Sequence, residues 1–84
     1  MKYMYPVKPE MDLKVFLQTC DKIREKFPTA QTDGVITDFL DGSHYEKIDI
    51  GSDWIWVYDD FDVGAVFVES SIRLNDLFAE EHIH

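Results

Sequence analysis

The sequence predicts a small α+β domain: a four- to five-stranded antiparallel sheet, mostly a meander, with an N-terminal amphipathic helix and a short C-terminal helix packed on one face. Two patterns predict this class. Apolar residues recur at helical spacing before residue 28, and they alternate with a period of two after residue 34. The chain of 84 residues is 45% hydrophobic, which suits one compact core, so we expect residues 1–84 to form a single domain.

The first helix is predicted after Pro9. Its apolar residues recur every three or four positions, which places them on one stripe of a helix. Asp12 or Glu10 near the start complements the helix dipole, and Pro28 ends the helix. We expect this stripe to face the core; its members are Leu13, Phe16, Leu17, Cys20, Ile23 and Phe27.

The remaining elements are predicted from alternation and turn residues. Residues 3–7 indicate an edge strand, because Pro6 cannot donate a hydrogen bond to a neighbouring strand. Residues 34–69 indicate a four-stranded meander, with turns at Asp41-Gly42, Gly51-Ser52-Asp53 and the acidic segment 59–62. Its first strand is expected to run through residue 40. Ser70 or Ser71 is predicted to cap a final helix with an apolar face of Leu74, Leu77 and Phe78.

Alternation also assigns the two faces of the last two strands. Ile55, Val57, Val66 and Val68 are the expected core-facing set. The opposite face would then carry an aromatic row, which is an unusual exposure for a soluble monomer and indicates a binding surface or a dimer contact. That row consists of Trp54, Trp56, Tyr58 and Phe67.

Charge excludes several classes of partner. The formal net charge is −9 and the pI is about 4.5. Nucleic acid and anionic membrane surfaces are bound through clustered Lys and Arg, so neither is expected as a partner. No segment approaches the length of a membrane span, and Cys20 has no second cysteine to pair with. These features predict a cytoplasmic protein.

No pattern in the sequence indicates catalysis, a cofactor or a metal. Asp60-Phe61-Asp62-Val63-Gly64 matches the D-x-D-x-G opening of a calcium loop, but residue 71, where the closing glutamate should stand, is serine. We interpret the segment as a hairpin connection whose aspartates accept backbone hydrogen bonds. His44 has no paired acid in the local sequence, so no general-base role is indicated, and it is expected at the surface. His82 and His84, with Glu80 and Glu81, are interpreted as a solvated tail.

One resemblance covers about half of the chain. "TDGVITDFLDG" from Thr32 to Gly42, followed by "WIWV" and "AVFVES", resembles the C-terminal domain of the phosphohexomutases. The resemblance implies a fold analogy and, as one alternative, a degenerate sugar-phosphate-binding domain. The family's phosphate-binding loop of the R-P-S-G-T-E-P type is replaced here by "YDDFDVG", whose carboxylates would repel a dianion.

The leading hypothesis is a non-enzymatic interaction module or inhibitor that docks on a basic protein partner. Aromatic residues supply binding energy at interfaces, and surrounding charge selects the sign of the partner. One form of this hypothesis is an inhibitor that imitates nucleic-acid charge, as small acidic phage-type antagonists do. The alternative to a basic partner is a homodimer formed through the same face. The predicted binding residues are Trp54, Trp56, Tyr58, Asp59, Asp60, Asp62 and Phe67.

Overall fold

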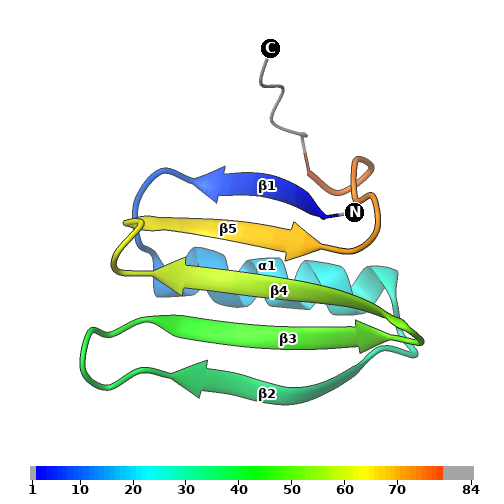
Figure 1. Ribbon diagram of the computed structural model, residues 1–84, viewed down its shortest axis with the longest axis horizontal. Coiled ribbons are helices and arrows are strands. Elements are labelled where there is room, and N and C mark those ends of the chain that lie inside the picture. Colours follow the sequence, from blue (N-terminus) through cyan, green and yellow to red (C-terminus); the bar gives the residue numbers. More distant parts are fainter. Residues whose placement is uncertain (1, 79–84) are drawn as a thin grey trace.

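The computed structural model describes residues 2–78, and in this part of the chain one helix packs on a five-stranded antiparallel sheet (Figure 1). The strand order is β1-β5-β4-β3-β2. This confirms the predicted α+β class with an antiparallel sheet. The elements are β1 (Tyr3–Lys8), α1 (Leu13–Lys26), β2 (Gln31–Thr37), β3 (His44–Ile50), β4 (Asp53–Asp60) and β5 (Ala65–Ser70).

Strands β2 to β5 form the predicted meander, and β1 completes the sheet by pairing with β5. The register places Tyr5 opposite Val68 and Pro6 opposite Phe67. β1 is an edge strand, so the missing N–H of Pro6 interrupts no central hydrogen-bond ladder. The first strand of the chain therefore pairs with the side of β5 that the meander leaves unpaired, and β1 becomes the edge of the sheet.

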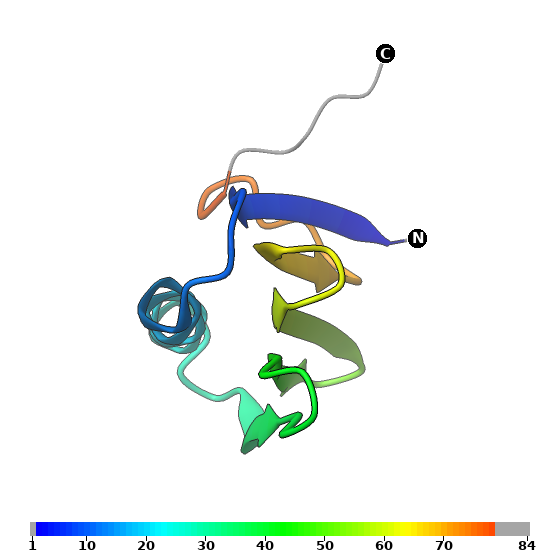
Figure 2. The same ribbon diagram turned by 90° about the vertical axis from the view of Figure 1, so that its left-hand side faces the viewer.

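Helix α1 covers one face of the sheet, and the other face has no helix over it in residues 2–78 (Figure 2). Asp12 caps its first turn, because its side chain accepts a hydrogen bond from the N–H of Val15 at 3.1 Å. Helix α1 lies between Pro9 and Pro28 as predicted, but it follows β1, so its description as an N-terminal helix is corrected.

The buried side of α1 differs from the predicted stripe. Phe16, Cys20 and Ile23 are buried as expected, but Leu13 and Leu17 keep 45% and 42% of their surface exposed. Thr19 takes part of the buried side, and its hydroxyl donates to the carbonyl of Val15 at 2.7 Å. This self-satisfied polar side chain lets the contact stripe shift around the helix, away from the two leucines.

Replacing Leu17 with alanine is therefore expected to lower the free energy of unfolding by less than about 1 kcal/mol. Alanine is the better helix former, and 42% of the leucine surface is already exposed to solvent. Urea denaturation followed by circular dichroism measures the change. A loss above about 2 kcal/mol, which is typical of a fully buried leucine, would contradict this orientation of the helix.

The predicted C-terminal helix is wrong for the described residues. Ser70 ends β5 and accepts a hydrogen bond from the N–H of Ile72, while the hydroxyl of Ser71 accepts one from the N–H of Trp54. Both serines thus tie turns and strands together instead of capping a helix. The following segment makes a single turn, in which the N–H groups of Leu77 and Phe78 both donate to the carbonyl of Leu74.

The β2–β3 connection also differs from prediction. Phe39 and Leu40 were expected in a strand, but β2 ends at Thr37 and both side chains are almost completely exposed. The reason lies in Asp38: its carboxylate accepts the N–H of Leu40, and its carbonyl accepts the N–H of Gly42 at 2.8 Å. These bonds close a turn before the alternating pattern has ended.

The core lies between α1, the C-terminal turn and the helix-facing side of the sheet. All four residues predicted to face it on β4 and β5 are fully buried. Within residues 2–78, no helix is long and apolar enough to cross a bilayer. The buried apolar set is Tyr5, Phe16, Cys20, Ile23, Ile48, Ile55, Val57, Val66, Val68, Leu74 and Phe78.

Candidate functional site: the open aromatic face

An apolar row crosses the entire sheet on the side away from α1. Residues directly opposite each other in antiparallel strands point to the same face, so the register identifies the row. It contains one residue from each strand, namely Pro6, Phe67, Tyr58, Tyr45 and Ile36. We use the name aromatic row for these five residues together with the predicted Trp54 and Trp56, which lie on the same face of β4.

The rings at the centre of the row contact one another. Tyr58 stacks on Phe67 with ring centroids 4.6 Å apart, and Tyr45 meets Tyr58 edge to face at 5.8 Å. Trp56 lies two positions before Tyr58 on β4, and the centroids of their rings are 6.0 Å apart. These are favourable aromatic geometries, and they hold the rings in place before any partner arrives. Such preorganisation reduces the entropy lost on binding.

Charges next to the row are largely neutralised. The ammonium of Lys2 lies 2.8 Å from a carboxylate oxygen of Glu69, and the ammonium of Lys47 lies 3.6 Å from a carboxylate oxygen of Asp49. Burial alone would raise the pKa of Glu69, but hydrogen bonds from Lys2 and Tyr58 outweigh it and hold this pKa below its usual value. Burial and the neighbouring Glu69 raise the pKa of Tyr58, so its hydroxyl stays neutral. The centre of the face is therefore aromatic and nearly uncharged.

Unbalanced negative charge lies at the margins of this face. Asp60 ends β4, and its side chain accepts the N–H groups of Asp62 and Val63 at 2.8 and 3.1 Å. This confirms the hairpin interpretation for Asp60. Asp62 itself is exposed in the turn. In the part of the chain the structure describes, no three metal-ligating side chains gather closely enough to hold an ion.

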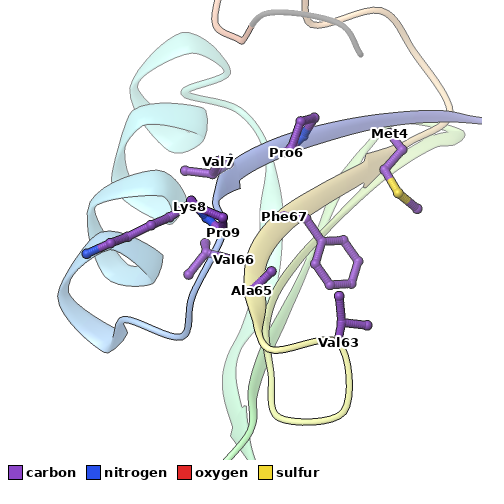
Figure 3. A pocket seen from close by; sticks show the side chains of 9 residues that line it. All are labelled: Met4, Pro6, Val7, Lys8, Pro9, Val63, Ala65, Val66 and Phe67. Carbon is purple, nitrogen blue, oxygen red and sulfur yellow. The ribbon is translucent and has the colours of Figure 1, made fainter. Parts of the chain in front are cut away.

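An apolar hollow of about 340 Å³ adjoins one end of the aromatic row (Figure 3). It lies where β1 diverges from β5 and is bordered by the β4–β5 turn. Met4, Val63 and Phe67 lie together on the side away from the helix. Lys8 is the one charged residue that lines the hollow, and its ammonium is engaged by Asp12 at 2.6 Å. The hollow thus suits an uncharged apolar group.

The structure places the seven predicted binding residues in three locations. Trp54, Trp56, Tyr58 and Phe67 share the open face, and Asp60 and Asp62 lie at its margin. Asp59 lies elsewhere: it is 2% exposed and faces the helix, which corrects its assignment to the acidic bend. β4 continues through Asp60, so alternation turns Asp59 to the same side as Ile55 and Val57.

Asp59 joins a polar cluster beneath α1. Its carboxylate accepts the backbone N–H of Asp12 at 3.0 Å, and its second oxygen lies 3.6 Å from Nδ1 of His44. His44 was expected at the surface, which is wrong, and the acid that the local sequence lacks comes from β4. His44 is partly buried, and Asp59 is its direct partner across β3 and β4.

Sequence reasoning also missed a buried ion pair. Glu46 is 1% exposed and accepts hydrogen bonds from Arg24 and from the hydroxyl of Thr32. Burial opposes its ionisation, but these bonds prevail and lower the pKa of Glu46. Burial, followed by the negative charge of Glu46, raises the pKa of the Cys20 thiol, which makes a reactive thiolate unfavourable.

The tail residues Glu80, Glu81, His82 and His84 lie outside the described residues. The open aromatic face, with its hollow and acidic margin, is the candidate site that the described residues form. No family model, curated protein or solved structure matches the chain at a significant level.

Proposed function

We propose that this chain is a non-enzymatic protein-interaction module or inhibitor whose open aromatic face docks on a basic protein partner in the cytoplasm. The observation that carries the proposal is the aromatic row, which crosses all five strands and which no helix of residues 2–78 covers. A flat, rigid aromatic surface with neutral centre and charged margin is the usual anatomy of a binding interface.

The distribution of charge supports a basic partner. Residues 31–70 contain ten acidic residues against a single basic one, Lys47. Helix α1, on the opposite side, contains four basic and two acidic residues. The meander that forms most of the open face therefore carries most of the acidic residues of the chain, although two of them, Glu46 and Asp59, are buried on the helix side. Charge of this kind speeds encounter with a positively charged surface and opposes contact with another copy.

The homodimer alternative uses the same face and has one argument in its favour, the apolar row itself. It requires two strongly acidic meanders to approach each other, which costs energy at low salt. Sedimentation velocity over a range of protein concentrations separates the two. A monomer at all concentrations supports the basic-partner proposal, and dimerisation that is abolished by Trp56→Ala would replace it.

The proposal predicts that Trp56→Ala weakens binding to a captured partner at least tenfold. A truncated aromatic in the centre of an interface removes both contact area and the stacking that orders Tyr58. The partner is first isolated from the native host and purified, and binding is then measured by titration calorimetry. Leu17→Ala, which removes an exposed apolar side chain on the helix, away from this face, is the control and should bind normally.

Ionic strength supplies the second criterion. Binding that depends on opposite charges should weaken as salt is raised, most strongly for a nucleic-acid-binding partner if the acidic surface imitates DNA or RNA. Equal affinity of Trp56→Ala and Leu17→Ala would contradict the use of this face. Binding unaffected by salt would contradict the choice of a basic partner. A melting temperature raised by sugar phosphates alone would favour the degenerate sugar-phosphate-binding alternative.

A further inference from the structure

Two hairpin connections in the sheet have the same construction. The β2–β3 turn runs from Asp38 to Gly42, and the β4–β5 turn runs from Asp60 to Gly64. In each, the carbonyl of the first aspartate accepts the glycine N–H four residues later at 2.8 Å. In each, the carboxylate of that aspartate also accepts the N–H two residues on. Both glycines have positive φ, 80° and 71°, which other residues rarely adopt.

Each turn presents a phenylalanine at its second position. Phe39 is 93% exposed and is followed by Leu40 at 98%; Phe61 is 59% exposed, with Val63 at 63%. Exposed apolar residues are normal when single, but four at one end of a small domain form a patch. Because aspartate carboxylates and backbone groups make the turn bonds, none of these apolar side chains is required to form either turn.

The two turns lie side by side. Both lie at the same end of the sheet (Figure 1), and a hydrogen bond from the N–H of Phe61 to the hydroxyl of Ser43 at 2.9 Å joins them. Ser43 is fully buried, so water does not compete for this hydrogen bond between the two turns. We call the pair of turns the twin turns. They form one end of the sheet, whereas the aromatic row runs across its open face.

The charge pattern indicates what covers this end. Aspartates flank the apolar residues in both turns: Asp38 and Asp41 flank Phe39 and Leu40, and Asp60 and Asp62 flank Phe61. Aspartate next to an apolar side chain opposes insertion into a bilayer and contact with an identical acidic end. Lysine or arginine beside an apolar groove would complement it.

We propose that the twin turns insert Phe39 and Phe61 into an apolar groove of a partner protein that is rimmed by Lys and Arg. The turns act as two rigid anchors, and the interleaved aspartates pair with the rim. Phe39, Leu40 and Phe61 do not belong to the aromatic row, and the two surfaces share only Asp60, Asp62 and Val63 at the border of the candidate site, so the twin turns would remain if the row proved to be a dimer contact.

The test uses the full chain and a defined probe: a fluorescently labelled helical-hairpin peptide whose two helices enclose a leucine-lined groove flanked by lysines. This probe reproduces an apolar groove with a basic rim. The variant Phe39→Ser/Phe61→Ser should fold normally, because the turn bonds remain, and thermal melting verifies this. Fluorescence anisotropy should show at least tenfold weaker binding than the native chain. Leu17→Ser, an exposed apolar residue on α1, should change the affinity less than twofold.

Further experiments test whether the twin turns bind something other than a basic protein groove. A peptide with the same leucine-lined groove flanked by glutamates should not bind, and phosphatidylcholine vesicles should not retain the protein. Absence of binding to the lysine-flanked peptide would overturn the proposal, as would equal losses in Leu17→Ser. Loss with Trp56→Ala but not with Phe39→Ser/Phe61→Ser would assign the probe to the aromatic row. Vesicle binding, or self-association that requires both phenylalanines, would assign the twin turns to lipid or to a second copy.

Discussion

Replacing Arg24 with leucine is expected to lower the free energy of unfolding by about 3 kcal/mol at pH 7. Breaking a buried ion pair by removing one partner leaves an uncompensated charge, which typically costs 3–5 kcal/mol. We take the lower end, since the Arg24 side chain is 38% exposed and only Glu46 is deeply buried. Urea denaturation of both proteins measures the difference.

The pH dependence of this loss follows from Glu46. Its pKa in the folded protein lies below the ordinary 4.5, so ionised Glu46 stabilises the fold above that value, and this contribution disappears as pH falls through the folded pKa. The loss of unfolding free energy caused by Arg24→Leu should therefore be greatest at neutral pH and should shrink as pH falls below the ordinary glutamate pKa of 4.5. Asp21→Asn, which removes the exposed partner of Arg24, is the control and should cost less than about 0.5 kcal/mol. A deficit independent of pH would contradict the assigned role of Glu46.

Tyr5→Phe should destabilise the protein by about 2 kcal/mol. The Tyr5 hydroxyl is fully buried, accepts the N–H of Leu74 at 2.7 Å and donates to the side chain of Asn75 at 3.0 Å. Phenylalanine keeps the ring but leaves a buried N–H without its acceptor, at a cost of about 1–3 kcal/mol. The hydrogen bond between Tyr5 and Leu74 thereby joins two positions that are 69 residues apart in the chain.

Amide hydrogen exchange locates that effect. The N–H of Leu74 should exchange faster in Tyr5→Phe, while amides in the centre of β4 change only by the global loss of stability. Unchanged protection at Leu74, or a loss below about 0.5 kcal/mol in urea, would show that the hydroxyl does not hold the C-terminal turn against the sheet.

Period-two alternation predicted the sheet well because each strand has one buried face. It placed Ile55 and Val57 toward the core, and the same parity would have turned Asp59 and Glu46 inward. Those two were missed because carboxylates are normally exposed, and their partners come from distant segments: Arg24 from α1 for Glu46, and the backbone of Asp12 for Asp59. Local sequence contains no record of such pairings.

Errors at the ends of elements have a different cause. Phe39 and Leu40 fit a strand by hydrophobicity, yet the Asp38 carboxylate closes a turn around them. Ser70 and Ser71 fit a helix cap by residue type, yet the hydroxyl of Ser71 accepts the N–H of Trp54 instead. In both places a short polar side chain hydrogen-bonds to the backbone and competes with regular structure, an outcome that apolar periodicity does not reveal.

The most direct test of the central claim is tryptophan fluorescence. Trp54 and Trp56 are the two tryptophans of the chain and both lie on the open face, so the whole indole signal reports on that face. Neutral acrylamide should quench both, and caesium should quench better than iodide at equal ionic strength, because surrounding acidic charge attracts the cation. Addition of the purified basic partner should protect both indoles. Indoles that acrylamide cannot reach in the free monomer, or that stay equally accessible in the complex, would contradict an open aromatic docking face.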